Sequence, residues 1–241
     1  RVYDPFLTPK ACADLHSLEA VLACDIVSLH APLTVDGPYP SRHLINADNL
    51  PSLKEDAVLL SCGRGAVIDH AALLAFLPGR EDLCCVLDVW EPEPALDPAV
   101  LALVELGSPH IAGYSYDGKV TGTRMIAAAL HRAFDIEAPV DSGEGIQQGQ
   151  LIKAQGIDVQ SALFQVLLEA YDIKRDDGAL REVALDGKPI GGRFDALRKH
   201  YPKRLEFKHF TVDCSALDDD SRPMVTAQLQ ALGFRLKPLL G

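Results

Sequence analysis

Short apolar runs recur through the first half of the chain, at 25–29, 57–61, 83–88 and 106–111. Runs of this length with few interruptions are typical of parallel strands that are buried on both faces. Between them lie segments whose apolar spacing or capping signals favour helices, at 15–23, 47–53, 70–77 and 98–105. This alternation predicts an α/β fold with a doubly wound parallel sheet.

The second half of the chain has mainly helical patterns. Helices are predicted over 118–134, 159–171, 193–200 and 222–232, with short strands at 207–212 and 234–236. The composition of 137–149 is typical of a linker. We therefore expect a sheet domain over 1–115, a returning helix and linker over 116–149, and a small α+β domain over 150–241.

Capping residues support several of these helices. Asp14, Asp69 and Ser221 are predicted N-caps, and Gly233 is expected to end the last helix. The linker contains GEGIQQG, which superficially suggests a glycine-rich phosphate loop. No strand precedes it and its spacing is wrong, so no phosphate site is predicted there.

Polar residues stand at or just beyond the carboxyl ends of the predicted strands, namely His30, Arg64, Asp88 and His110. In an open α/β sheet, ligands bind outside these ends, so the four side chains are expected along one crevice. Each alone has a common structural explanation. A histidine after a proline is usually a turn residue, and an arginine between glycines is usually a surface or structural residue.

Composition narrows the classes of function. The chain has 241 residues, 48% hydrophobic residues and a formal net charge of −11. This charge argues against a nucleic-acid partner, since phosphate binding needs clustered Lys and Arg. No apolar run is long enough to predict a membrane span, and the N-terminus has no signal-peptide pattern.

The cysteines indicate a reducing compartment, which predicts a cytoplasmic protein. None of Cys12, Cys24, Cys62, Cys84, Cys85 and Cys214 belongs to a C-x-x-C pair. We interpret them as small buried hydrophobes and predict no metal site.

Three motifs, GRGAVID, LDVWEPEP and SPHIAGY, resemble those of the NAD-dependent D-2-hydroxyacid dehydrogenases. In the second half, YDIKRDDGALR and GGRFDALRKHYPKRLEF resemble the C-terminal domain of the erythronate-4-phosphate dehydrogenase branch. The resemblance runs from about Val2 to the end of the chain. It implies a Rossmann NAD-binding domain followed by a dimerisation domain, and therefore a homodimer with NAD as cofactor.

The resemblance also implies the catalytic residues. His110 is the expected base for the substrate hydroxyl, and Glu93 would set its tautomer and stabilise the imidazolium. Arg64 offers a planar fork to the substrate carboxylate. The prolines around Glu93 predict a stiff, extended loop. Tyr114 is a candidate substrate-binding residue, with a packing role as the equal alternative.

Four further residues are expected near the cofactor. Asp88 would accept a hydrogen bond from the nicotinamide amide, and Gly113 would allow close approach. Asp4 fits the acidic residue that bonds the adenosine ribose, although alone it would be interpreted as a turn residue before proline. Ala31 stands where the branch has threonine, so only a backbone contact to the cofactor is expected. His30 is left open, because it could orient its loop.

The function implied is NAD-dependent oxidation of 4-phospho-D-erythronate, a small phosphorylated 2-hydroxy acid, in pyridoxal phosphate synthesis. Two alternatives stay open: another D-2-hydroxyacid dehydrogenase, and an NADH-sensing binding protein on the same fold. The resemblance also implies a first βαβ unit whose glycine loop would lie about 20 residues before Asp4. We therefore expect this chain by itself to bind NAD poorly, to lack activity and to aggregate.

Overall fold

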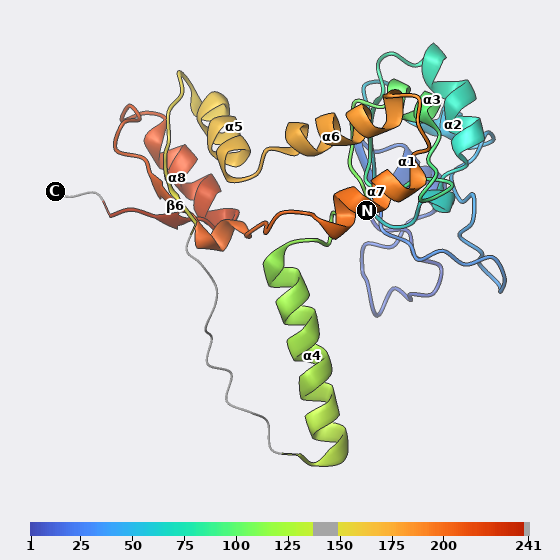
Figure 1. The fold of residues 1–241 in the computed structure, drawn as a ribbon, viewed down its shortest axis with the longest axis horizontal. Helices are drawn as coiled ribbons and strands as arrows, with labels where there is room; N and C mark the ends of the chain where they lie inside the picture. Colours follow the sequence, from blue (N-terminus) through green and yellow to red (C-terminus); the bar gives the residue numbers. More distant parts are fainter. Residues whose placement is uncertain (137–148, 239–241) are drawn as a thin grey trace. The chain divides into compact units, whose positions relative to one another are not determined.

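The computed structural model describes residues 1–136 and 149–238 (Figure 1). Contacts divide the chain into two units, Arg1–Ala112 with Lys174–His200, and Gly113–Ile173 with Tyr201–Gly241. These units cut across the predicted parts 1–115, 116–149 and 150–241, because residues 174–200 group with the first 112 residues. Apart from Gly149, the predicted linker and its GEGIQQG run lie outside the described residues.

A parallel sheet of four strands forms the centre of the first unit, in the order β1-β2-β3-β4. Its strands are β1 (Ile26–Leu29), β2 (Val58–Ser61), β3 (Cys84–Leu87) and β4 (Leu106–Gly107). Each lies within a predicted run, so the predicted parallel α/β sheet is confirmed, although β4 is shorter than predicted. Because the strands are parallel, their carboxyl ends meet at one edge of the sheet.

Short helices connect these strands. They are α1 (Leu18–Leu22), α2 (His70–Phe76) and α3 (Pro98–Leu103), with 3-10 turns η1 (Leu50–Ser52), η2 (Gly65–Val67) and η3 (Leu77–Gly79). The predicted helix over 47–53 is therefore reduced to the turn η1.

The capping of these helices was predicted in part. Asp69 caps α2 as predicted, because its carboxylate accepts the N–H groups of Ala71 and Ala72 at 3.0 and 3.1 Å. The predicted cap Asp14 is wrong. The N-cap of α1 is Ser17, whose side chain accepts the Ala20 N–H, while Asp14 pairs with the amino group of Arg1 at 3.0 Å.

Two helices from later in the chain complete the first unit, α6 (Ile173–Leu185) and α7 (Gly191–Lys199). Their residues Leu180, Ala184 and Phe194 are buried in the same cluster as the sheet residues. The guanidinium of Arg181 donates to the carbonyls of Leu101 and Val104 at 2.8 and 2.9 Å. Asp177 accepts the N–H of Gly107 at 2.7 Å. These contacts satisfy the last carbonyls of α3 and an N–H of the edge strand β4.

The second unit contains the long helix α4 (Tyr116–Phe134) and a parallel sheet in the order β5-β6-β7. The strands are β5 (Leu151–Lys153), β6 (Thr211–Asp213) and β7 (Arg235–Leu236), and the other elements are α5 (Val159–Ala170), η4 (Phe207–His209) and α8 (Arg222–Ala231). A buried cluster that includes Ile152, Val166, Val212 and Leu229 joins the sheet to α5 and α8.

The structure departs from the sequence prediction at the termini of two of these elements. The predicted strand over 207–212 begins with the 3-10 turn η4, and β6 starts only at Thr211. Ser221 occupies the N-cap position of α8 as predicted, but its side chain makes no capping bond, and its hydroxyl donates to the Asp218 carboxylate at 2.6 Å. By contrast Gly233 ends α8 as predicted, with a left-handed φ of 93° that favours glycine.

Candidate active site

His110 lies in the loop that follows β4. Its φ is 54°, a left-handed value, and its backbone N–H donates to the Asp88 carbonyl at 2.7 Å. The imidazole Nδ1 lies 2.7 Å from Glu93 Oε2. Because a carboxylate only accepts hydrogen bonds, Nδ1 carries the hydrogen, and a neutral imidazole held in this way has its lone pair on Nε2. This is the arrangement of a base oriented by a carboxylate.

Glu93 is fixed by its own loop. Its Oε1 accepts the backbone N–H of Trp90 at 2.8 Å, so the loop turns back on itself and the predicted extended conformation is wrong. Trp90 is 2% exposed, and its indole N–H donates to the Ser108 carbonyl at 2.9 Å. Trp90 therefore ties the Glu93 loop to the His110 loop.

Asp88 holds the loop that carries His110. The side chain is 4% exposed, and Oδ1 accepts the Ser108 hydroxyl and the Ile111 N–H at 2.6 and 2.7 Å. Oδ2 accepts the Ala112 N–H at 2.9 Å. Asp88 thus makes three hydrogen bonds to residues 108–112, and its predicted bond to the nicotinamide amide stays a prediction.

Arg64 follows β2 at the same edge of the sheet and is exposed. Its Nη1 donates to the carbonyl of Gly63 at 2.8 Å, and this is the one side-chain hydrogen bond recorded for it among the described residues. The rest of the guanidinium fork is accessible to an anionic ligand, as its predicted role requires.

The glycines on either side of Arg64 allow its turn to pack closely against neighbouring loops. A Cβ at Gly65 would lie 1.9 Å from the Trp90 carbonyl oxygen, and one at Gly63 would lie 2.9 Å from the Ala31 carbonyl oxygen. Such distances exclude any side chain at Gly65. The Arg64 turn is therefore pressed against the loops that follow β1 and β3.

The remaining predicted residues of the first unit have mainly local contacts. Asp4 Oδ1 accepts the Phe6 N–H at 2.9 Å. This bond is typical of a turn residue, which is the alternative to a ribose contact that the sequence left open for Asp4. His30 Nε2 lies 2.8 Å from the Ser28 hydroxyl, so His30 is held within its own strand end. Ala31 approaches Gly63 with its carbonyl. The cofactor roles of Asp4 and Ala31 stay predictions.

Gly113 and Tyr114 belong to the second unit. A Cβ at Gly113 would meet no atom within 4 Å. The Lys119 ammonium lies 3.8 Å from the centre of the Tyr114 ring, and the ring packs edge-to-face on Tyr201 at 5.9 Å. Their assigned roles at cofactor and substrate stay predictions.

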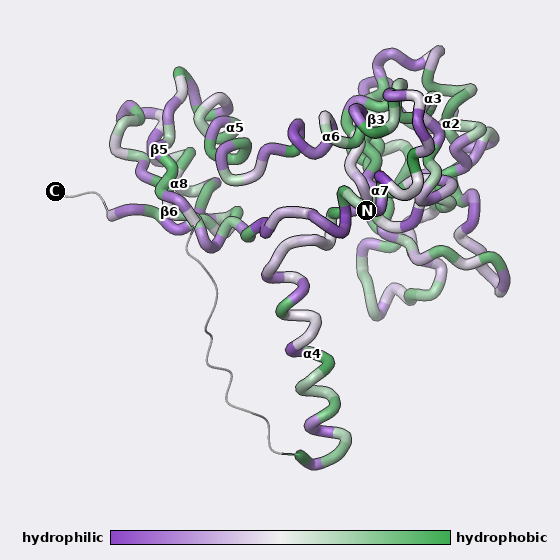
Figure 2. Tube along the Cα trace, viewed as in Figure 1, coloured by the Kyte–Doolittle hydropathy of each residue, from purple (hydrophilic) through white to green (hydrophobic). Residues whose placement is uncertain are grey.

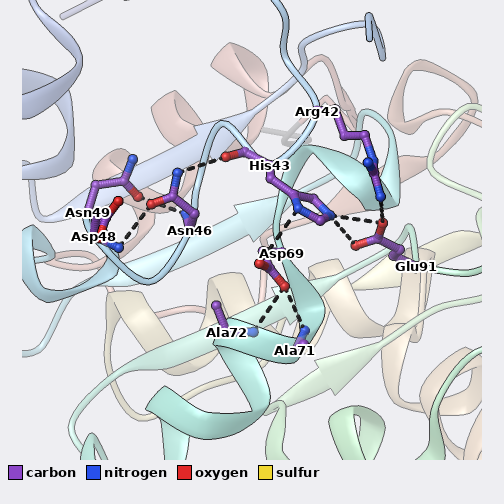
Figure 3. A network of polar contacts seen from close by, with 9 residues as sticks. All are labelled: Arg42, His43, Asn46, Asp48, Asn49, Asp69, Ala71, Ala72 and Glu91. Carbon is purple, nitrogen blue, oxygen red and sulfur yellow. Dashed lines mark hydrogen bonds and ion pairs between the residues drawn. The ribbon is translucent and has the colours of Figure 1, made fainter.

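A polar network around His43 was not predicted (Figure 3). His43 Nε2 lies 3.0 Å from both oxygens of Glu91, and Nδ1 lies 3.6 Å from Asp69 Oδ2. The Glu91 N–H donates to Nδ1 of the buried His70 at 3.3 Å. Burial lowers the pKa of His70, and the carboxylates of Glu91 and Asp69 only partly offset this, so His70 is neutral. A histidine–glutamate pair 48 positions apart leaves no periodic signal in a sequence.

His110, Glu93 and Arg64 together supply a base, the carboxylate that orients it and a cation at one edge of the parallel sheet. This set can take a proton from a hydroxyl while the cation fixes a nearby carboxylate. No group of three or more His, Cys, Asp or Glu within the described ranges could hold a metal ion.

Residues 1–112 match the family described as D-isomer specific 2-hydroxyacid dehydrogenase, NAD binding domain, and residues 146–233 match a domain of unknown function (DUF3410). The chain is 44% identical to an erythronate-4-phosphate dehydrogenase of Cellvibrio japonicus, over 98% of this chain and 63% of the relative. It is 41% identical to that of Teredinibacter turnerae, over 97% of this chain and 61% of the relative. The chain thus spans about three-fifths of the length of these curated relatives.

Two solved structures are similar over about half of this chain. The NAD-complexed D-isomer specific 2-hydroxyacid dehydrogenase of Lactobacillus delbrueckii is 26% identical with a TM-score of 0.45, covering 56% of this chain and 46% of its own. A D-lactate dehydrogenase of Treponema pallidum is 32% identical with a TM-score of 0.40, covering 48% of this chain and 39% of its own.

Proposed function

Through residues 1–112 the chain belongs to the D-isomer specific 2-hydroxyacid dehydrogenase family, and we propose that the full-length protein oxidises 4-phospho-D-erythronate with NAD. The product is (R)-3-hydroxy-2-oxo-4-phosphooxybutanoate, in a step of pyridoxal phosphate synthesis. The observation that carries this proposal is the Glu93–His110 pair, with 2.7 Å between Oε2 and Nδ1, at the sheet edge that also presents Arg64. Relatives named erythronate-4-phosphate dehydrogenase match nearly the whole chain, including the tail.

In the proposed reaction His110 is the general base. Its Nε2 takes the proton of the 2-hydroxyl group, while Nδ1–H stays bonded to Glu93. The carboxylate then faces an imidazolium and stabilises the charge that has formed. Since Glu93 is itself held by the Trp90 N–H at 2.8 Å, the pair needs little rearrangement during the proton transfer.

Arg64 is the proposed binding group for the substrate carboxylate. Its guanidinium is exposed, and its one recorded bond among the described residues leaves most of the donor fork for a bidentate contact. Fixing the carboxylate orients the neighbouring hydroxyl-bearing carbon toward the base.

NAD fits the residues at this sheet edge. His30, Arg64, Asp88 and His110 follow the carboxyl ends of the parallel strands β1 to β4, and this is the edge where open α/β sheets bind ligands. When bound, NAD supplies the hydride acceptor. We assign Asp4 to the ribose, since no side-chain hydrogen bond is recorded for its Oδ2 among the described residues. Ala31, Asp88 and Gly113 complete the proposed cofactor contacts.

We also propose a homodimer formed through residues 150–241. What supports it is an apolar surface on α5, where Phe164 and Leu168 lie one turn apart and are 54% and 38% exposed. A second apolar stretch runs along α4, which is green toward its C-terminal end in Figure 2, with Ile126 74% exposed and Phe134 68% exposed. A twofold dimer is the commonest soluble assembly.

We further propose a cytoplasmic location. The cysteines that the structure describes are free, as thiols in a reducing compartment are. Within the described ranges, no helix has both the length and the apolar character that crossing a membrane requires.

The test is turnover by the full-length protein. NADH formation is measured with 4-phospho-D-erythronate, with unphosphorylated D-erythronate and with D-lactate. The proposal predicts the highest kcat/KM for the phosphorylated acid. Faster turnover of an unphosphorylated acid would identify another D-2-hydroxyacid dehydrogenase. Tight NADH binding without turnover of any acid would identify an NADH-sensing binding protein.

A further inference from the structure

The loop after β3 carries two carboxylates that have different partners. Glu93 Oε2 lies 2.7 Å from His110 Nδ1. Glu91, two positions earlier, has both oxygens 3.0 Å from His43 Nε2, and Arg42 Nη2 lies 3.9 Å from its Oε1. The two carboxylates therefore connect one loop to the base on one side and to His43 on the other.

His43 is itself held in place (Figure 3). Its backbone N–H donates to the Ala66 carbonyl at 2.8 Å, and Nδ1 lies 3.6 Å from Asp69 Oδ2. The other oxygen of Asp69 caps α2. The imidazole thus bridges a helix cap and a loop carboxylate, and its side chain is only 31% exposed.

The connection from His43 to the base is short. Glu91 is anchored by its side chain to His43 and by its N–H to His70 Nδ1 at 3.3 Å. One residue separates it from Glu93, whose carboxylate orients His110. A loop released at Glu91 would let the Glu93 carboxylate move, and a displacement of about 1 Å in a catalytic group can cost about 10²-fold in rate.

We propose that His43 is a positioning residue of the proposed dehydrogenase: by binding Glu91 it fixes the loop that aims Glu93 at His110. The expected loss of kcat rests on the proposed function, whereas the expected displacement of the Glu93 carboxylate rests on the geometry alone. His43 touches no reacting atom in this role. Its loss lowers kcat and leaves the KM for NAD unchanged, because the assigned cofactor contacts belong to other residues.

The decisive variant is His43→Gly. The φ of His43 is 52°, which glycine adopts without strain, so the substitution removes the imidazole and leaves the backbone conformation accessible. We expect kcat to fall about tenfold to about 10²-fold, and added imidazole to restore part of it. His16→Gly is the matched control, since His16 also pairs with a carboxylate, Asp14 at 3.1 Å, and is 38% exposed.

A double-mutant cycle separates this role from a general structural one. If His43 acts through Glu91, then His43→Gly, Glu91→Ala and the double variant lose similar amounts of kcat. Losses that multiply in the double variant, or a His43→Gly enzyme with wild-type kcat, would overturn the proposal.

A second readout does not depend on turnover. In the full-length protein labelled with ¹⁵N-histidine, the His110 Nδ1–H bonded to Glu93 gives a slowly exchanging proton signal, identified by its absence in His110→Ala. We expect His43→Gly to broaden this signal and imidazole to restore it. An unchanged signal in His43→Gly would contradict the positioning role of His43, whether or not the wild type is an active dehydrogenase. A wild type without dehydrogenase activity would overturn only the proposed function.

Discussion

Arg64 is the cation that the proposed reaction needs at the substrate carboxylate. Arg64→Lys keeps the charge but loses the planar fork, so paired contacts to a carboxylate are lost. Hydrogen bonds to charged groups contribute about 1.5–3 kcal/mol, so kcat/KM should fall about 10-fold to 150-fold. Steady-state kinetics on the full-length protein measure this.

The matched control is Arg193→Lys. Arg193 pairs with Asp186 on the surface of the same unit, so this variant should keep its kcat/KM. Equal kcat/KM values for wild type and Arg64→Lys would remove Arg64 from the carboxylate site.

Asp4 tests the cofactor assignment. A carboxylate at the ribose repels the 2′-phosphate of NADP, by about 1 kcal/mol or more for charges about 4 Å apart. Asp4→Asn retains an oxygen for the Phe6 N–H but loses the charge. The ratio of kcat/KM for NAD over NADP should therefore fall about fivefold or more in this variant. A wild type that uses both cofactors equally would contradict the assignment.

The pairing of Glu93 with His110 could be predicted from the sequence. Each residue lies in a short continuous motif, LDVWEPEP or SPHIAGY, and the family resemblance gave each its role. The anchors of that pair could not be predicted in this way. Trp90, Ser108 and His43 act through backbone groups or partners from other loops, and such contacts depend on tertiary structure. The same holds for Asp88, whose three hydrogen bonds depend on the conformation of residues 108–112.

At the scale of elements, the start of α4 depends on a buried carboxylate. Asp117 is 4% exposed and accepts hydrogen bonds from His209 at 2.6 Å and Lys208 at 2.9 Å. Burial raises the pKa of Asp117, but these hydrogen bonds outweigh it and lower the pKa from 3.8 to about 2. A folded-state pKa below the unfolded value stabilises the fold above about pH 4, and this contribution is lost as the pH falls through about 2.

We therefore expect acid to destabilise the first turn of α4. Between about pH 4 and pH 2 its opening free energy should fall by about 2 kcal/mol, as measured by amide hydrogen exchange. In Asp117→Asn this fall should be absent, because the titrating group is gone. Equal pH profiles for the two proteins would show that Asp117 does not control this turn.

Helix α6 was not predicted from the sequence pattern. Its run of Lys, Arg and Asp hides an apolar face of Leu180 and Ala184. Arg181 of this helix binds the backbone carbonyl of Leu101, 80 positions earlier in the chain. Asp177 accepts the backbone N–H of Gly107, 70 positions earlier. By contrast β1, β2 and β3 are continuous apolar runs, which is why their positions were predicted within one residue at either end.

At the scale of the whole molecule, the proposed dimer can be tested on α5. Phe164→Glu with Leu168→Glu places charges on the proposed interface, so light scattering of the full-length protein should report a monomer. Val35→Glu is the matched control, because Val35 is 63% exposed and apolar but belongs to the first unit and lies outside residues 150–241. A protein that stays dimeric with both α5 changes has its interface elsewhere.

In the proposed reaction His110, oriented by Glu93, takes the proton from a 2-hydroxy acid. The most direct measurement compares kcat for NAD-dependent oxidation of 4-phospho-D-erythronate between the full-length wild type and His110→Ala, with NAD binding measured in parallel. We expect His110→Ala to lose about 10²-fold to 10⁴-fold in kcat and to retain its affinity for NAD. A His110→Ala protein that turns over at nearly the wild-type rate would contradict this role of His110.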